Sequence, residues 1–409
     1  MAVPAHIPSA KITPPRIGVP LLKRERLLSM VHEGLTRRLL ILCAEAGYGK
    51  TSLLLSALPE VGGPVAWLTL DESDADPNLF GAGLIAAVGA VVPETGDLVP
   101  GILTMGPDMA ELRRALLGAL DSLPETVIVL DDFHTVERNP EIVRLVDDLL
   151  GHLPPPIRLV IATRTWPRLQ VLPRLLVQGQ ATTVDHSHLK FSRDETAAFF
   201  RASHSLEMDD LLAGGLTERT EGWPAALQLI ALRAKAQGRA DVHGTPREIY
   251  DYLAATVLDT LDPVTRGFVL RASILTELWP SVCQALVPEV DAGTMLAEVE
   301  RSNLFLYRLD DAGPRYRFHQ LFAEFLRQRL SDEEGSKAVS ALHYAAAQRF
   351  EAEGIPDLAV RHYFAAGALG EAERVMKPLH GDRLTSRLAY AFRDLACGCP
   401  RTFSSSTRG

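Results

Sequence analysis

Short apolar runs alternate with longer amphipathic stretches over the first half of the chain. Five runs have the length and composition of strands: LLILC, VAWLTL, TVIVL, IRLVIA and ATTVD. Stretches with helical spacing, such as ELRRALLGALDSL, separate them. Because strands that alternate with helices form a parallel sheet covered on both faces, the pattern predicts an α/β domain over residues 31–185.

After Asp185 the pattern becomes helical. SRDETAAFFRASH and WPAALQLIALRAKAQ have helical spacing, which predicts an all-α helical domain over residues 186–247. Helices continue through residues 248–335 and end in LFLYRLDDAGPRYRFH, where two short strands flank an Asp-Asp-Ala-Gly turn. Helices followed by one hairpin indicate a winged-helix domain over this last range.

The two ends of the chain have different patterns. Five prolines in the first 20 residues predict an extended N-terminal arm, placed over residues 1–30. The Ala-rich helix pair within residues 336–395 predicts the start of a TPR-like helical-repeat solenoid. Residues 396–409 have no periodicity and are expected to form a disordered tail.

Composition narrows the class of protein. The 409 residues include 42 Lys plus Arg and 51 Asp plus Glu, and the net charge of -9 gives no general attraction to nucleic acid or an anionic membrane. The four cysteines are too few and scattered for a disulfide scaffold. No apolar window reaches the length of a membrane helix or a signal-peptide core. We therefore expect a cytoplasmic protein without membrane contact.

The segment AEAGYGKT lies between the first apolar strand and a helical stretch, which is the context of a phosphate-binding loop (P-loop). Gly47 and Gly49 allow backbone amides to turn toward phosphate oxygens, Lys50 neutralises the β and γ phosphates, and Thr51 offers its hydroxyl to Mg2+. Ala44 replaces the usual first glycine, which is tolerable if its φ stays negative. The alternative is a Gly-rich turn with an incidental lysine.

A second motif follows downstream. The strand TVIVL ends in Asp131 and Asp132, of which Asp131 is expected to bind Mg2+ and Asp132 to orient the attacking water. A helix N-cap is the alternative for such a pair. Arg164 follows the strand IRLVIAT and is expected to sense the γ-phosphate, with a surface salt bridge as the alternative.

Together these features predict ATP or ADP with Mg2+ as cofactors. The catalytic candidates are Lys50, Asp132 and Arg164, and the metal ligands are Thr51 and Asp131. The residues expected to contact nucleotide in the loop are Ala44, Glu45, Ala46, Gly47, Tyr48, Gly49, Lys50, Thr51 and Ser52.

Several motifs in the same order resemble one family: AEAGYGKTSLL, WLTLDESDADPNLF, VIVLDDFH, LVIATR, LKFSRDE, TEGWPAALQL and FHQLFAEFLRQRL. The chain is similar from about Lys11 to Met376 to the MalT-like signal-transduction ATPases, which are LuxR-family regulators of the STAND class of P-loop NTPases. The resemblance implies the domain order described above. It also implies a switch that ADP holds at rest, that an inducer turns on through ATP, and that slow hydrolysis resets.

The resemblance carries four further residues to the nucleotide. Leu22 and Arg24 match the family's segment near the adenine, Pro224 in Gly-Trp-Pro matches the residue that packs on the base, and His319 matches a winged-helix histidine at the ADP β-phosphate. Three of the matched positions have plainer alternatives, because Arg24 is also compatible with a solvated position, Trp223 with a core residue alone, and His319 with a satisfied core histidine.

The leading hypothesis is therefore a nucleotide-dependent regulatory switch, an ATPase that turns over slowly. A P-loop motor or enzyme and a nucleotide-independent helical interaction module are the alternatives. The resemblance implies self-association in the ATP state and an inducer of unknown identity. The family's helix-turn-helix does not follow within these 409 residues, so DNA contact is expected only through a C-terminal domain absent from this chain. The change of pattern after about Leu395 suggests a truncated or frameshifted product.

Overall fold

The structure is a computed structural model that describes residues 7–17, 20–93, 109–121, 123–237, 247–309 and 315–377. The chain divides into two compact units. The first comprises Met1–Thr260, Val299–Phe305 and His319–Leu321, and the second comprises Leu261–Glu298, Leu306–Phe318 and Phe322–Gly409. The expected tail over residues 396–409 and part of the expected repeat lie outside the described residues.

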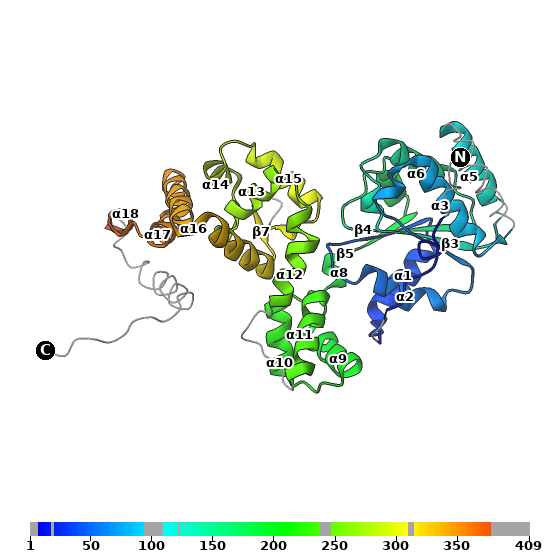
Figure 1. The fold of residues 1–409 in the computed structure, drawn as a ribbon, viewed down its shortest axis with the longest axis horizontal. Helices are drawn as coiled ribbons and strands as arrows, with labels where there is room; N and C mark the ends of the chain where they lie inside the picture. The colour runs from blue at the N-terminus through cyan, green and yellow to red at the C-terminus, as the bar shows by residue number, and fades with distance from the viewer. Residues whose placement is uncertain are drawn as a thin grey trace, which may run out of the picture. The chain divides into compact units, whose positions relative to one another are not determined.

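The first unit contains a five-stranded parallel sheet (Figure 1). Its strands are β1 (Leu39–Cys43), β2 (Val65–Thr69), β3 (Thr126–Asp131), β4 (Ile157–Thr163) and β5 (Ala181–Asp185). Their order is β2-β3-β4-β1-β5, and every pairing is parallel. The predicted α/β sheet is confirmed, and its parallel strands bring the ends of β1, β3 and β4 to one edge.

Helices cover both faces of this sheet. They are α1 (Glu25–Leu35), α2 (Lys50–Ala57), α3 (Pro77–Gly89), α5 (Met109–Asp121), α6 (Pro140–His152), α7 (Leu172–Val177) and α8 (His186–Leu189). Figure 1 shows α3, α5 and α6 on one face and α1 and α2 on the other. Leu39 and Ile41 join the apolar cluster under α3, α5 and α6, while Leu40 and Leu42 are buried on the opposite face.

Short 3-10 segments and an ordered part of the N-terminal arm complete the α/β region. The segments are Leu58–Glu60, Glu72–Ala75 and Phe133–Thr135. The carbonyl of Lys11 accepts a hydrogen bond from the backbone amide of Thr69, and Lys11 Nζ lies 2.8 Å from Asp71 and from Asp74. This arm therefore adds to the edge of β2.

The rest of the first unit is helical. It contains α9 (Arg193–His204), α10 (Asp210–Thr220), α11 (Pro224–Gln237), α12 (Arg247–Thr256) and the 3-10 segment Leu258–Thr260. The Ser192 side chain accepts from the Glu195 amide while Glu195 accepts from the Ser192 amide, a capping box that fixes the start of α9. The predicted helical region after Asp185 is thus present.

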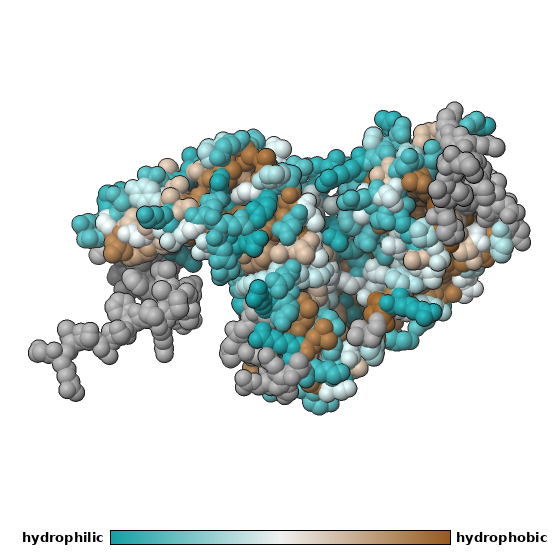
Figure 2. All heavy atoms as spheres, in the orientation of Figure 1, coloured by the Kyte–Doolittle hydropathy of each residue, from teal (hydrophilic) through white to brown (hydrophobic). Residues whose placement is uncertain are grey.

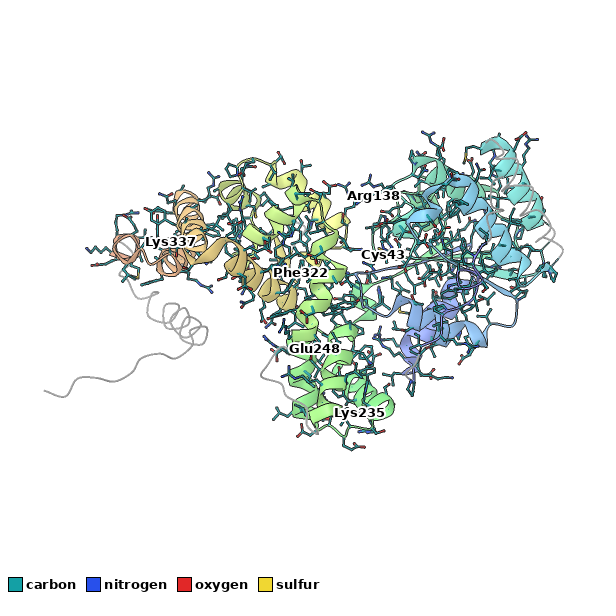
Figure 3. The ribbon with its side chains drawn as sticks, in the orientation of Figure 1. Cys43, Arg138, Lys235, Glu248, Phe322 and Lys337 are labelled. Atoms are coloured by element: carbon teal, nitrogen blue, oxygen red, sulfur yellow. The ribbon has the colours of Figure 1, made fainter. Side chains whose placement is uncertain are left out.

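Helices and a short hairpin make up the second unit. The elements are α13 (Pro263–Ala272), α14 (Pro280–Leu286), α15 (Ala292–Arg301, whose last turn belongs to the first unit), β6 (Leu306–Arg308), β7 (Tyr316–Phe318), α16 (Gln320–Ala352), α17 (Pro356–Ala365) and α18 (Leu369–Met376). β6 and β7 pair antiparallel, and Phe322, labelled in Figure 3, is buried. Gly335 has φ 78°, which breaks α16 into two helices.

The visible surface of the described residues is mostly hydrophilic, with smaller hydrophobic areas between (Figure 2). Within the described part of the chain, every helix is too short or too polar to span a bilayer. The positions of the domain boundaries remain predictions.

Candidate nucleotide-binding site

The loop between β1 and α2 has the backbone of a phosphate-binding turn. It leaves the sheet after Cys43, labelled in Figure 3, and Gly47 and Gly49 have φ angles of 75° and 79°. Gly49 is the N-cap of α2, so the positive end of this helix faces the loop. Ala44 is buried and has a negative φ, so no glycine is needed at this position.

Lys50 is buried against the loop that it follows. Its Nζ donates hydrogen bonds to the carbonyl oxygens of Ala44 and Glu45, at 2.7 and 3.1 Å. Burial lowers the pKa of Lys50 to about 8, although the charge of Asp132 opposes this shift. A phosphate at the loop would compete with these neutral carbonyls, because charged acceptors form stronger hydrogen bonds.

Thr51 and Asp131 bring hard oxygen ligands together. Thr51 Oγ1 donates to Asp131 Oδ2 at 3.0 Å, and Asp131 Oδ1 accepts from the Asp132 amide at 3.1 Å. Burial, and then the neighbouring charge of Asp132, raise the pKa of Asp131 to about 6. A hydroxyl beside a carboxylate suits Mg2+, which takes one or two protein carboxylates and completes its shell with water and phosphate oxygens. Groups of three or more His, Cys, Asp or Glu suited to a metal do not occur among the described residues.

Beyond Asp131 the chain turns sharply. Asp132 has φ 58°, a conformation that side-chain-bearing residues rarely adopt and that often marks functional sites. His134 Nδ1 lies 3.7 Å from Asp132 Oδ1. Burial, followed by the charges of Arg164 and Lys50, lowers the pKa of His134 to about 3, so its imidazole is neutral. The sequence analysis did not single out His134, although it closes the motif VIVLDDFH.

Arg164 lies at the end of β4, on the same edge as Asp131. Its Nη1 donates to the carbonyl oxygen of Thr256 at 3.3 Å, and its own carbonyl accepts from Asn303 Nδ2 at 2.7 Å. Arg164 therefore connects the sheet edge to the helical part of the first unit. The contact of Asn303 was also not predicted from the sequence, because no motif around Asn303 indicates a functional residue.

The Gly-Trp-Pro segment is bound directly to the phosphate-binding loop. Trp223 Nε1 donates to the Ala46 carbonyl at 3.0 Å, and the Ala225 amide donates to the Gly47 carbonyl at 3.0 Å. A Cβ on Gly47 would lie only 2.5 Å from the Cβ of Ala225. Pro224, the first residue of α11, lies between these two contacts in sequence.

His319 belongs to the same cluster. Its side chain is fully buried, with ring centroids 5.8 Å from Trp223 and 5.7 Å from Phe305. Its Nδ1 accepts from the Leu321 amide, so its Nε2 carries the proton and donates to the Thr220 carbonyl at 3.1 Å. His319 thus packs on Trp223, which binds the loop.

Arg24 joins the segment before α1 to the start of α9. Its guanidinium donates to three acceptors: the carbonyls of Leu189 and Lys190, at 2.8 and 2.6 Å, and Glu195 Oε2 at 2.8 Å. Burial lowers the pKa of Arg24, and Glu195 opposes this shift. Arg24 is therefore not a solvated residue, while a contact of Arg24 or the half-buried Leu22 with adenine stays a prediction.

Glu45 and Tyr48 are also buried in the loop. Tyr48 is fully buried, with its ring 6.2 Å from that of His186 and 6.3 Å from that of Phe305. The Glu45 carboxylate is buried, and no other described residue donates a hydrogen bond to it. Burial raises the pKa of Glu45 to about 7, against the opposing charge of Lys50. The sequence placed Glu45 in the loop but did not predict a buried carboxylate there.

Comparisons with known proteins agree with this arrangement. Residues 254–338 match the family described as the MalT winged helix domain. Over 379 residues, 88% of this chain, the sequence is 33% identical to the HTH-type transcriptional regulator MalT of Klebsiella pneumoniae subsp. pneumoniae, of which it covers 41%. It is also 32% identical over 376 residues to the serine/threonine-protein kinase PknK of Mycobacterium tuberculosis, covering 88% of this chain and 33% of the kinase.

A solved structure supports the fold. The Walker-type ATPase of Pyrococcus abyssi superposes with a TM-score of 0.56 at 16% identity, covering 75% of this chain and 95% of that protein. The chain spans only about two fifths, 41%, of the Klebsiella regulator. The loop geometry and these similarities together imply nucleotide binding. The chain is therefore similar in sequence to the MalT regulators, and its α/β region, which has the fold of a Walker-type ATPase, precedes the segment that matches the MalT winged helix domain.

Proposed function

We propose that this chain is an ATP-binding signal-transduction switch, at rest with ADP and active with ATP, which hydrolyses ATP slowly. One observation carries the proposal: the helical part of the first unit binds the phosphate-binding loop itself, through Trp223 to Ala46 and Ala225 to Gly47. A loop held in this way transmits a change at the phosphates to the helices.

Each residue of the loop edge has a separate role. Backbone amides between Gly47 and Gly49 bind phosphate oxygens, and Lys50 exchanges its two carbonyl acceptors for phosphate. Thr51 and Asp131, whose oxygens lie together, would hold Mg2+. When bound with this ion, ATP supplies the γ-phosphate whose presence distinguishes the active state from the resting state.

The residues around the γ-phosphate position provide slow hydrolysis. Asp132 orients a water molecule, with the neutral His134 beside it as a second acceptor or donor. Arg164, at the end of β4, would contact the γ-phosphate if it exchanged its hydrogen bond to the Thr256 carbonyl for one to phosphate. Because Arg164 is already joined to α12, its movement would also report the nucleotide state to the helical region.

The resting state depends on contacts that favour ADP. We assign the adenine to Leu22, Arg24 and Pro224, and the β-phosphate to His319, as the family resemblance implies. In the structure His319 packs on Trp223, which supports a coupled response of this pair. A ligand shifts a two-state equilibrium only by its difference in affinity for the two states, so loss of His319 should favour the active state.

The proposed partners follow from the relatives. The Klebsiella protein is an HTH-type transcriptional regulator by name, and we propose that this chain likewise serves transcription regulation. Self-association in the ATP state and response to an inducer belong to the same proposal. We assign DNA contact to a C-terminal domain of the kind that the family resemblance implies, and to none of the 409 residues of this chain.

Binding of fluorescent ADP and an ATP analogue tests the proposal. Lys50→Ala should abolish binding, whereas Lys23→Ala, which removes an exposed lysine paired with Glu60, should leave it unchanged. Unchanged nucleotide binding by Lys50→Ala would rule out the phosphate-binding assignment. Slow turnover with retained ADP is expected; fast steady turnover would instead identify a motor or enzyme.

A further inference from the structure

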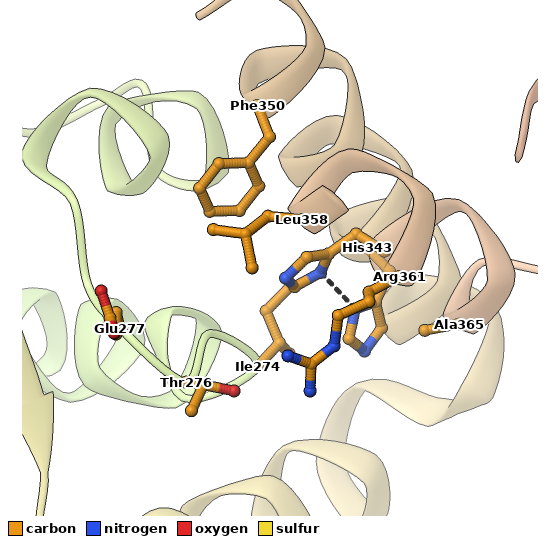
Figure 4. Close-up of a pocket in the computed structure, with 9 residues that line it drawn as sticks. Ile274, Thr276, Glu277, His343, Phe350, Leu358, Arg361 and Ala365 are labelled. Carbon is orange, nitrogen blue, oxygen red and sulfur yellow. Dashed lines mark hydrogen bonds between the residues drawn. The ribbon is translucent and has the colours of Figure 1, made fainter. Parts of the chain in front are cut away.

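The second unit contains a cavity of about 250 Å³ that no part of the proposed switch uses. It is lined by the segment after α13, by the second half of α16 and by α17 (Figure 4). Four of its lining residues are apolar: Ile274, Phe350, Leu358 and Ala365. Its volume suits a compact metabolite, since pockets for drug-sized ligands are larger, roughly 300–1,000 Å³.

Two histidines on neighbouring helices form the polar wall of this cavity. His343 Nδ1 and His362 Nδ1 lie 2.9 Å apart, joined by the dashed line in Figure 4. One of these nitrogens must therefore carry a proton and the other a lone pair. In the neutral pair, one Nε2 is a donor and the other an acceptor. Neither Nε2 has a hydrogen bond to another described residue, so each keeps its capacity to donate or accept one.

Arg361 contributes a positive charge beside this pair. Within the described part of the chain, its guanidinium has neither a hydrogen bond nor an ion pair. The only carboxylate among the lining residues, Glu277, lies apart from the histidines in Figure 4 and 3.7 Å from Arg315 Nη1. The end of the cavity near Arg361 is therefore positive, and its charge is not neutralised by Glu277 or by another described partner.

We propose that this cavity binds a small organic anion, whose carboxylate or phosphate group contacts Arg361 and one Nε2 atom of the His343–His362 pair. The body of the ligand packs on Ile274, Phe350 and Leu358. Guanidinium and imidazole donors favour such groups because charged hydrogen bonds are the strongest available to a protein. The site does not depend on the proposed switch, since none of its residues belongs to the first unit.

Binding of the anion should be coupled to uptake of a proton. Burial lowers the pKa of His343 to about 4 and that of His362 to about 3, and the nearby charges of Arg327 and Arg361 act in the same direction. An anion that accepts from one Nε2 atom and lies beside the pair opposes these effects and raises the pKa of the pair. A pair that has gained one proton offers both Nε2 atoms as donors, so affinity should increase as the pH falls.

Nuclear magnetic resonance of the full chain with isotope-labelled histidine tests the site. Inorganic phosphate and propionate are the two probes, and their comparison separates a phosphate ligand from a carboxylate ligand. At least one probe should produce saturable shifts of the His343 and His362 rings. Arg361→Gln should weaken this binding about tenfold or more, the effect expected for loss of a charged hydrogen bond.

Arg349→Gln is the matched control, because Arg349 lies on α16 but pairs with Glu353 and does not line the cavity. It should bind the probe as the parent chain does, and thermal melting should show that both variants are folded. Failure of both probes to shift the two rings would overturn the proposal. Equal affinity of Arg361→Gln and Arg349→Gln would overturn it too.

Discussion

Trp223→Phe tests whether the contact between the helices and the phosphate-binding loop controls nucleotide affinity. The substitution keeps an aromatic ring in a fully buried position but removes the Nε1 donor that lies 3.0 Å from the Ala46 carbonyl. A buried carbonyl without its partner costs roughly 1–3 kcal/mol. If this cost falls on the docked, ADP-bound form, ADP should bind about 5–150-fold more weakly and dissociate faster.

Trp223→Phe should also lower the stability of the fold, and this part of its effect is independent of nucleotide. Trp67→Phe controls for it, because Trp67 is equally buried in β2 and its Nε1 donates to Thr69 Oγ1 at 2.9 Å. Both substitutions should lower the melting temperature, by about 2–4 °C for each kcal/mol in a large domain. Only Trp223→Phe should change ADP affinity and release.

Titration calorimetry and stopped-flow release of fluorescent ADP provide the measurements. Equal ADP affinity and release in Trp223→Phe and Trp67→Phe would refute the reasoning, even if both variants melt earlier. The Trp223 contact would then support the fold alone, and the coupling between helices and loop would have to lie elsewhere.

Three further predictions concern the loop and the carboxylate of Asp131 beside it. Gly47→Ala forces a side chain into a backbone with φ 75° and places its Cβ 2.5 Å from the Cβ of Ala225. Melting experiments should therefore show that the free energy of unfolding falls by roughly 1–3 kcal/mol or more. Gly62→Ala is the control and should leave stability unchanged, because a Cβ at Gly62 would meet open space. Glu45 has a folded-state pKa of about 7 against an ordinary 4.5, so stability should fall as pH rises through this window; in Glu45→Gln that fall should be missing from melting curves. Asp131→Asn should weaken ATP binding in Mg2+ far more than in a chelator, and equal loss in both, measured by calorimetry, would contradict a metal role.

The sheet and the loop were predictable because their signals are local. The five apolar runs of strand length correspond to the five strands of the parallel sheet. The glycines of the loop, Gly47 and Gly49, have the positive φ that a phosphate-binding turn requires. The condition set for Ala44, a negative φ, is also met. The resemblance to MalT-like regulators is confirmed by the winged helix match and by 33% identity over most of the chain.

Long-range pairing was not predictable, because it depends on how distant segments pack. Trp223 lies 177 positions from Ala46, and the sequence offered only a family motif for it. The spacing of His343 and His362 does not reveal that their rings meet across two helices. Arg24 was equally compatible with solvent or adenine, and only the fold shows its carbonyl and Glu195 partners.

Gly47 has two independent reasons to be glycine, and together they support the proposal that the phosphate-binding loop acts as a switch. Its positive φ shapes the loop, and its missing Cβ leaves room for α11, whose Ala225 amide binds its carbonyl. The same residue therefore belongs to the proposed phosphate cradle and to the helical contact. By thermodynamic linkage, the free energy by which docking of the helices strengthens nucleotide binding equals the free energy by which the nucleotide strengthens docking.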